Sequence, residues 1–280
     1  MTAAVLTAAL TGPIATKADN PALPTTPDEI AAAAADSHAA GAAIVHVHLR
    51  DAAGRPTADL DTARRTVALI GESCPALIQL STGVGLNVTF QERERLIEAR
   101  PEMATLNVCS MSFAGGEFRN PPHGVRRLAA NMRELGIKPE LEVYDTGHLE
   151  VALELAEEGL LQSPLQFSIV LGVRGGAAAT PQNLVHMVAR LPVDAVWQVI
   201  GIGDANLPMT AIGLAIGGNA RTGMEDTLRL RRGVPAAGNG ELVHRLAGVA
   251  RALEREPATV DETRALLGLR PGAAAGQEFG

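Results

Sequence analysis

The chain has 280 residues, close to the roughly 250 typical of one (β/α)₈ barrel, although two smaller domains would also fit. Apolar residues make up 46% of the chain and aromatic residues only 2%, so we expect a large core of Ala, Val, Leu and Ile. The net charge of −7 provides no basic surface, which argues against nucleic acid or an anionic membrane as a partner.

The start of the chain and its cysteines indicate where the protein works. Residues 1–10 are apolar but carry no Lys or Arg, and a turn at 11–13 makes the stretch too short to span a membrane. Cys74 and Cys109 are too few to indicate a secreted disulfide scaffold. We therefore expect a buried first strand in a cytoplasmic protein.

Short β-branched or apolar runs alternate with longer stretches of helix-forming residues along the chain. The predicted strands are 5–7, 43–48, 77–80, 103–108, 138–144, 165–171, 195–200 and 220–223. The predicted helices that follow them are 27–40, 61–71, 91–99, 124–135, 147–158, 181–189, 207–216 and 240–254.

Eight such β-then-α units predict a parallel sheet covered by helices. In a chain of this length they favour a closed (β/α)₈ TIM barrel over an open sheet. We expect a single catalytic domain over residues 1–270 and a flexible Ala- and Gly-rich tail over residues 271–280.

Two histidines lie in the second predicted strand. Active sites of these barrels lie at the C-terminal ends of the strands, and side chains two residues apart in a strand point the same way. His46 and His48 therefore both face the barrel interior. Two adjacent imidazoles are costly to bury without partners, and zinc is a usual partner for them. Two hydrogen-bonded core histidines are the other interpretation, but the aligned pair at a strand end favours a metal.

A catalytic zinc takes three protein ligands and keeps one position open. The other histidines lie in helices or at helix starts, so they are poor third ligands. Strand eight lies across the barrel mouth, and Glu225 after it can complete a His₂Glu site with Arg221 and Asp226 beside it. Adjacent acids are also common at helix N-termini, where they interact with the helix dipole, and that interpretation stays open for Glu225 and Asp226.

Other strand ends supply hydroxyl, amide and carboxylate groups. Glu140 and Glu142 share one face of the fifth strand. The glycine-rich turns 172–176 and 201–204 offer backbone N–H groups for phosphate or thioester oxygens, but the second lacks the third glycine of a dinucleotide fingerprint. The candidate substrate-binding residues at strands three and four are Ser81, Thr82, Gly83, Thr105 and Asn107.

A hydrolase triad is not evident in the sequence. Ser81 does not lie in a nucleophile elbow. Cys109 follows the fourth strand, but no histidine is clearly placed to activate it, so we interpret it as structural.

Taken together, these motifs resemble the β-keto acid cleavage enzyme family. The resemblance covers nearly the whole chain, and the ordered set of motifs is specific although each piece alone is weak. The segments that carry it are 6–12, 43–50, 54–56, 81–83, 101–107, 140–144, 170–173, 201–203 and 217–226.

The resemblance implies a homotetrameric (β/α)₈ barrel that binds zinc through His46, His48 and Glu225. It implies that Ser81 and Thr105 contact the substrate. It further implies that Arg221 and Asp226 serve the proton transfer. The implied reaction joins a β-keto acid with acetyl-CoA and yields acetoacetate and a new acyl-CoA. Its steps are deprotonation, condensation on the thioester, transthioesterification and retro-Claisen cleavage.

These residues suit that chemistry. Removing a proton beside a ketone builds negative charge on the ketone oxygen, which zinc can accept as a Lewis acid. Ser81 and the nearby turns supply donors for the substrate carboxylate. Asp226 suits the role of the base, but the cation of Arg221 lowers a carboxyl pKa, so burial has to offset it.

The chain departs from the family pattern at three positions. Family members that act on amino-bearing keto acids tend to carry an acid in the first βα turn, where this chain has Ile14. Arg174 stands where proline is frequent, and Asp204 stands where a basic residue is frequent. Ile14 cannot pair with an ammonium, and an Arg174 that reached the pocket would repel one. We therefore predict a preference for a neutral or anionic β-keto acid.

Two other functions are compatible with a barrel that carries paired histidines. A zinc amidohydrolase-type barrel usually carries its paired histidines on strand one and further histidines on strands five and six, which this chain lacks. A non-catalytic barrel that binds a small molecule is disfavoured by the full set of His46, His48, Glu225 and Asp226. Bound metal together with CoA-dependent turnover would separate the three functions.

Overall fold

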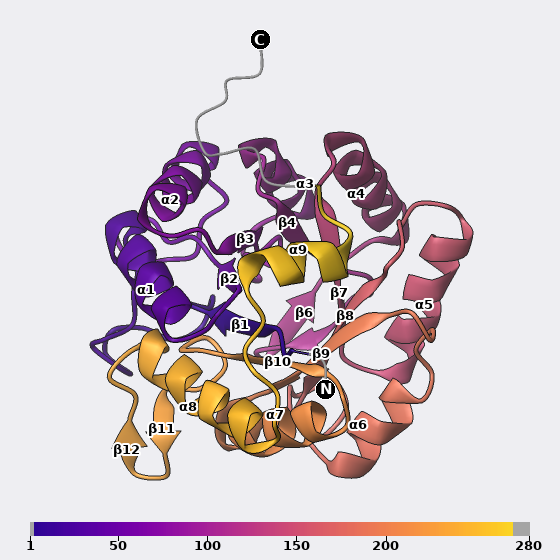
Figure 1. Cartoon of the computed structure of the whole chain (residues 1–280). Helices are drawn as coiled ribbons and strands as arrows, with labels where there is room; N and C mark the ends of the chain where they lie inside the picture. The colour runs from indigo at the N-terminus through magenta and orange to yellow at the C-terminus, as the bar shows by residue number, and fades with distance from the viewer. Residues whose placement is uncertain (1–2, 271–280) are drawn as a thin grey trace.

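Eight parallel strands close into a barrel in the computed structural model, which describes residues 3–270 (Figure 1). The order of hydrogen-bonded neighbours is β1-β10-β9-β8-β7-β4-β3-β2, with β2 pairing back to β1. The predicted single-domain TIM barrel is therefore confirmed, while the predicted tail 271–280 lies outside the described residues. The barrel strands are β1 Leu6–Ala9, β2 Ile44–Val47, β3 Leu77–Leu80, β4 Met103–Asn107, β7 Lys138–Val143, β8 Gln166–Leu171, β9 Val196–Gly201 and β10 Asn219–Thr222.

Eight helices surround the barrel and bury the outward side chains of its strands (Figure 1). Each follows a strand, as the sequence predicts, and several begin at the expected caps. At the first helix the Thr26 hydroxyl accepts the Glu29 N–H, and the Glu29 carboxylate accepts the Thr26 N–H. The helices are α1 Pro27–Ala39, α2 Leu60–Ser73, α3 Phe90–Glu94, α4 Pro122–Leu135, α5 Thr146–Glu157, α6 Pro181–Val188, α7 Asn206–Ala215 and α8 Asn239–Ala252.

The helix predicted over residues 91–99 is α-helical only in its first part. The chain forms α3 and then tightens into a 3₁₀-helix, η1 Arg95–Ala99. Arg100 ends this segment in a left-handed conformation with φ of 55°. The next residue is Pro101, which disfavours a helical conformation at Arg100. A second short 3₁₀-helix, η2 Gly203–Ala205, precedes α7.

Two hairpins extend the loops at the C-terminal end of the barrel, and the sequence analysis did not predict them. The loop after β4 contains β5 Met111–Phe113 and β6 Gly116–Phe118, and the loop after β10 contains β11 Arg229–Arg231 and β12 Val234–Pro235. Ala114 and Gly115 both have positive φ in the first hairpin, which suits a tight two-residue turn.

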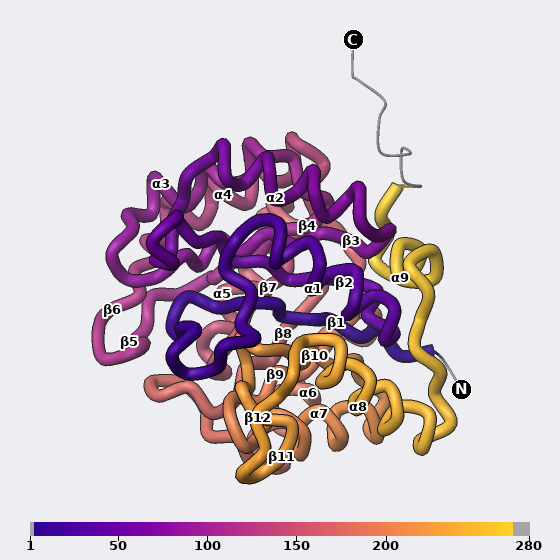
Figure 2. Tube along the Cα trace, turned by 90° about the vertical axis from the view of Figure 1, so that its left-hand side faces the viewer, coloured from indigo at the N-terminus to yellow at the C-terminus, as the bar shows by residue number. Residues whose placement is uncertain are grey.

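The N-terminal end of the barrel is closed by a ninth helix, α9 Val260–Leu267, which the sequence analysis also missed. Figure 1 shows α9 across the barrel opening, and Figure 2 shows it at the opposite end from β5 and β6. Leu267 is fully buried and belongs to a cluster at the strand starts that includes Val5, Ile44, Leu77 and Met103. The pattern Thr259 to Glu262 is a capping box that could have revealed this helix.

The interior of the barrel is polar rather than aliphatic in its middle layer. The Thr7 hydroxyl donates to Gln198 Oε1 at 2.8 Å, and Gln198 Nε2 donates to Glu140 Oε1 at 2.6 Å. The Ser168 hydroxyl donates to the same Glu140 oxygen at 2.5 Å. These side chains come from four different strands, so their bonds tie the barrel together below its C-terminal mouth.

No helix among residues 3–270 is long and apolar enough to cross a membrane.

Candidate active site

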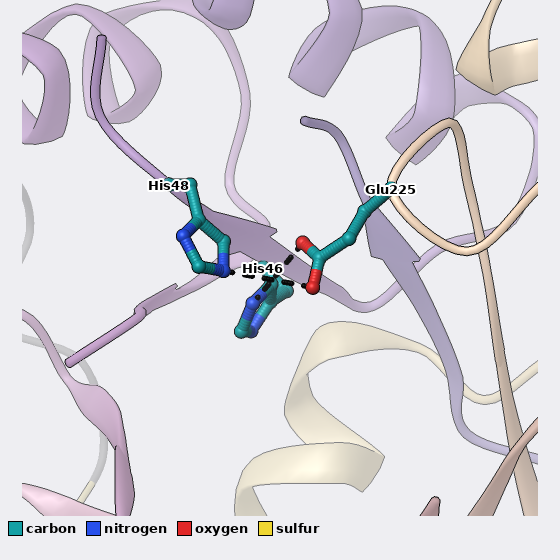
Figure 3. A group of neighbouring side chains, drawn as sticks. All are labelled: His46, His48 and Glu225. Carbon is teal, nitrogen blue, oxygen red and sulfur yellow. Dashed lines mark ion pairs between the residues drawn. The ribbon is translucent and has the colours of Figure 1, made fainter. Parts of the chain in front are cut away.

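The predicted metal ligands converge at the C-terminal end of the barrel. Figure 3 shows the rings of His46 and His48 and the carboxylate of Glu225 pointing toward one another. His46 Nε2 lies 3.3 Å from Glu225 Oε2, and His48 Nε2 lies 3.5 Å from Glu225 Oε1. One ligand atom from each residue lies within 4.8 Å of the other two. Two nitrogens and a carboxylate at this spacing match the donor set of a catalytic zinc.

Glu225 reaches the histidines by a shorter route than the sequence analysis expected. Strand eight of the barrel, β10, does not lie opposite β2, because both strands pair with β1. The carboxylate therefore passes over the end of a single strand. A Cβ at Gly12, just after β1, would lie 2.6 Å from Glu225 Cγ, so only glycine leaves room for this approach.

Two of the donor atoms that face one another have no hydrogen-bond partner among residues 3–270. His46 Nε2 and Glu225 Oε2 are both buried, and neither makes a hydrogen bond with residues 3–270. On the other side of the ring, His46 Nδ1 lies 2.8 Å from Gln79 Oε1, which can only accept. Nδ1 therefore carries a proton, and when the ring is neutral its Nε2 presents a lone pair to Glu225. A buried lone pair and a carboxylate at 3.3 Å need a cation between them, and the residues fit a metal.

The electrostatics of the three residues also attract positive charge. Burial and Arg221 lower the pKa of His46, but the carboxylates of Glu225 and Glu140 outweigh them and raise it. Burial lowers the pKa of His48. Burial raises the pKa of Glu225, but Arg221 and the two imidazoles hold it well below its ordinary value. Glu225 is thus a carboxylate, the form that binds a metal.

Arg221 organises the carboxylates beside the three ligands. Its Nε and Nη2 donate to the two carboxylate oxygens of Asp226 at 3.0 and 2.8 Å, and Nη2 also donates to Glu225 at 2.7 Å. Its Nη1 lies 3.6 Å from Glu142. Burial raises the pKa of Asp226 to about 6, although Arg221 lowers it. Burial thus offsets the effect of Arg221 on the pKa of Asp226, which is the condition for a base beside an arginine.

Glu142 belongs to this cluster, although the sequence analysis did not select it as a site residue. Its Oε2 accepts from Asn107 Nδ2 at 2.8 Å. Burial, followed by the neighbouring Glu140, raises the pKa of Glu142 to about 7. The alternation of side chains along β7 was the available signal, because it turns Glu140 and Glu142 to the same side as Thr105 and Asn107 on β4.

A cavity of about 290 Å³ opens above the cluster. The predicted catalytic residues Arg221 and Asp226 line it together with His48 and Glu225, while His46 is fully buried and is not among the lining residues. Its outer wall is apolar and includes Phe113 and Phe118 of the β5–β6 hairpin, Val170, Val173 and Ile202. Five predicted substrate-binding residues also line it: Ile14, Ser81, Gly83, Asn107 and Arg174.

Thr82 and Thr105 are buried in the wall between β3 and β4 and are not among the residues that line the cavity. The Thr82 N–H donates to the Thr105 hydroxyl at 2.9 Å, and the Thr82 hydroxyl donates to the Thr105 carbonyl at 2.8 Å. These bonds join the ends of the two strands and hold Ser81 at the cavity.

The fold and the site together define a TIM-barrel enzyme with a candidate His₂Glu metal centre at the mouth of the barrel. The family model for beta-keto acid cleavage enzyme matches residues 3–269, and the chain belongs to that family.

Relatives with assigned reactions match over almost their whole length. The 3-keto-5-aminohexanoate cleavage enzyme of Fusobacterium nucleatum is 40% identical over 268 residues, 95% of this chain and 98% of the relative. The 3-oxoadipate:acetyl-CoA acetyltransferase of Cupriavidus necator is 35% identical over 269 residues, 95% of this chain and 94% of the relative. The apo structure of ObcA matches with a TM-score of 0.76 at 22% identity, which supports the fold. The match spans 89% of this chain and 66% of the ObcA chain.

Proposed function

We propose that the protein converts a β-keto acid and acetyl-CoA into acetoacetate and a new acyl-CoA. The observation that carries the proposal is the meeting of His46, His48 and Glu225 beside a cavity that Asp226 lines. At this meeting point His46 Nε2 and Glu225 Oε2 have no hydrogen-bond partner among residues 3–270. The names of relatives support the co-substrate. Besides the Cupriavidus enzyme, a 3,5-dioxohexanoate:acetyl-CoA acetone transferase of Paraburkholderia graminis is 33% identical over 300 residues, 96% of each chain.

Zinc would be held by His46, His48 and Glu225. When bound there it would supply a Lewis acid for the negative charge that develops on the ketone oxygen. The two nitrogens and one carboxylate suit zinc better than the all-oxygen sites of magnesium or calcium.

Asp226 is the proposed base, and it takes the proton from the carbon between the ketone and the carboxylate of the substrate. Its pKa of about 6 lets it be ionised at neutral pH and still accept a proton. Arg221 bonds both oxygens of Asp226 and one oxygen of Glu225, so it fixes the base next to the proposed metal ligand. The carboxylate of Asp226 therefore has little rotational freedom left to lose during the reaction.

Ser81 is the proposed donor to the substrate carboxylate. Its hydroxyl oxygen accepts the Gly83 N–H at 3.2 Å, which leaves its own O–H free to donate into the cavity. Direct contact between Thr105 and the substrate stays a prediction from the family resemblance. The bonds between Thr105 and Thr82 support a role in holding Ser81 in place.

The proposed substrate has a neutral or anionic tail. Every carboxylate that lines the cavity, on Glu142, Glu225 and Asp226, already lies near Arg221. Ile14 lines the rim with 62% of its surface exposed, and it cannot pair with an ammonium. Arg174 lines the same cavity, and its guanidinium makes no ion pair or side-chain hydrogen bond with residues 3–270. It would repel a cationic tail and attract a carboxylate.

A panel of β-keto acids supplied with acetyl-CoA would test the reaction, with thioester exchange followed by mass spectrometry. We expect acetoacetate and a new acyl-CoA to form in equal amounts. Hydrolysis without CoA would indicate the amidohydrolase-type reaction, and binding without turnover would indicate a non-catalytic barrel. The homotetramer that the family resemblance implies is a separate proposal, which light scattering would measure.

A further inference from the structure

A second hollow of about 280 Å³ lies between the first turn of α7, the first two turns of α8 and the β11–β12 hairpin. We call it the arginine pocket, because its lining includes Arg229, Arg231, Arg232 and Arg245. The acidic residue in its lining is Asp204, which lies 3.6 Å from Arg229. Nothing in the proposed reaction chemistry uses these arginines.

The lining of the arginine pocket is positively charged, whereas the chain as a whole is negatively charged. The chain carries 24 Lys and Arg against 31 Asp and Glu, yet four arginines meet here with one acid. Arg231, Arg232 and Arg245 make no ion pair or side-chain hydrogen bond within residues 3–270. Like charges gathered around one hollow repel, and an anionic ligand relieves that repulsion. The planar fork of arginine suits phosphate in particular.

The arginine pocket and the catalytic cavity lie on two sides of the same short segments. Along the chain, Ile202 lines the cavity and Gly203 the pocket, while Asp226 lines the cavity and Thr227 the pocket. The Gly203 N–H donates to the Asp226 carbonyl at 2.7 Å and joins these segments. The pocket therefore sits beside the cavity, at the loops after barrel strands seven and eight. Phosphate sites of TIM barrels are frequent at those loops.

The remaining wall of the arginine pocket is apolar. It includes Leu207 and Pro208 in the first turn of α7, Leu230 in the hairpin, and Leu242 and Leu246 on α8. Arginines at the rim and leucines behind them suit a nucleotide, whose phosphates need cations and whose base needs an apolar surface.

We propose that the arginine pocket binds the phosphate groups of the acyl-CoA co-substrate. This rests on the proposed function, because only a CoA-dependent reaction brings that ligand to the cavity. The nucleotide end of CoA lies among the arginines, and the chain that ends in the thioester crosses the rim into the catalytic cavity. The arginine pocket thus selects the co-substrate, while the cavity selects the keto acid.

The double variant Arg231→Gln/Arg232→Gln tests the proposal, with Arg64→Gln/Arg65→Gln as its control. The control removes two neighbouring exposed arginines from α2, where they make surface pairs with Asp61 and Asp28. Both variants thus change the net charge equally. We expect the KM for acetyl-CoA to rise about tenfold or more in the pocket variant with little change in kcat, and to stay unchanged in the control. With acetyl-pantetheine, which lacks the phosphates, the pocket variant should match the wild-type protein.

Calorimetry with adenosine 3′,5′-bisphosphate separates this proposal from the proposed function, because it needs no turnover. We expect the wild-type protein and the control to bind this probe and the pocket variant to lose most of the affinity. If that pattern holds without thioester exchange, the pocket is a nucleotide phosphate site and the proposed function fails. If turnover occurs but acetyl-pantetheine serves as well as acetyl-CoA, the pocket proposal fails alone.

Two further results would overturn the pocket proposal. Inorganic phosphate that binds as tightly as the bisphosphate would show a simple anion site. A changed molecular mass of the pocket variant by light scattering, with an unchanged KM for acetyl-CoA, would show that the arginines contact another subunit. The single variant Arg245→Gln, on a different element, repeats the measurement if the double variant does not fold.

Discussion

The two ends of the barrel are built from the same strands but have opposite characters. At the C-terminal end, β2 delivers His46 and His48 to a buried cluster of charged side chains. At the N-terminal end, the same strand begins with Ile44, which packs with Leu77, Met103 and Leu267 under α9. Burying the charged cluster costs stability, whereas burying the apolar cluster provides it. Chemistry and stability are therefore separated along each strand.

This separation predicts that substitutions at the two ends act on different measurements. Changes at the C-terminal end should alter turnover, metal content or substrate choice in the folded protein. Changes under α9 should lower the free energy of unfolding and leave the kinetic constants of the remaining folded protein unchanged.

The largest effect is expected for Asp226→Asn. Loss of a general base typically slows a reaction by about 10²–10⁴-fold, and the amide cannot accept the substrate proton. The variant should keep its metal, because Asp226 is placed beside the ligands and not among them. Turnover and metal content are measured on the same sample. A near-wild-type rate would show that the base lies elsewhere.

Leu267→Ala should have the largest effect at the other end. Leu267 is fully buried between α9 and the strand starts, and Leu→Ala at such sites costs about 2–5 kcal/mol of unfolding free energy. Chemical denaturation measures the loss, and KM and kcat should match the wild-type values. Leu266→Ala is the matched control, because its side chain is 44% exposed. Equal destabilisation by both variants would refute the role of α9 as the apolar closure.

Ile14→Glu should shift substrate choice toward an amino-bearing β-keto acid. The wild-type protein should prefer a neutral or anionic substrate by about 100-fold in kcat/KM, because an ammonium in the cavity would lack a partner charge. A 100-fold preference corresponds to two tenfold steps of about 1.4 kcal/mol each. Competition between the two substrate types measures the ratio. Ile216→Glu is the control, because this exposed isoleucine does not line the cavity. A wild-type protein that works best on 3-keto-5-aminohexanoate would require another acid to hold the ammonium.

Thr259→Ala should give the smallest effect. The Thr259 hydroxyl accepts the Glu262 N–H at the start of α9, and loss of such a cap costs about 1 kcal/mol. Thermal unfolding should shift downward slightly with unchanged turnover. A drop in turnover without a drop in stability would mean that α9 communicates with the site.

The fold was predictable because its signals are local. Each barrel strand and the helix after it has its own apolar pattern, and caps such as Thr26 mark helix starts. The two hairpins and the 3₁₀ segment after α3 depend on contacts with other parts of the chain. Leu96 and Ile97 are buried within that segment, and no helical period shows that the chain tightens there. The capping box at Thr259 is a local signal of the same kind for α9.

The candidate site was predictable where geometry follows from strand alternation. The period of two turned His46 and His48 inward, and the position of Glu225 after the last strand brought it to the mouth. The sequence could not reveal that Thr82 and Thr105 bond to each other, or that Gln79 fixes the ring of His46. Those facts depend on the register between neighbouring strands, which no single strand encodes.

The chemical end of the barrel depends most on the proposed metal centre. Metal analysis of the wild-type protein and His46→Ala, purified side by side, tests it most directly. We predict about one zinc per wild-type chain and its loss in the variant, because His46 supplies an unpartnered nitrogen that faces Glu225. Denaturation should show that the variant stays folded. Full zinc occupancy in His46→Ala would contradict the assignment.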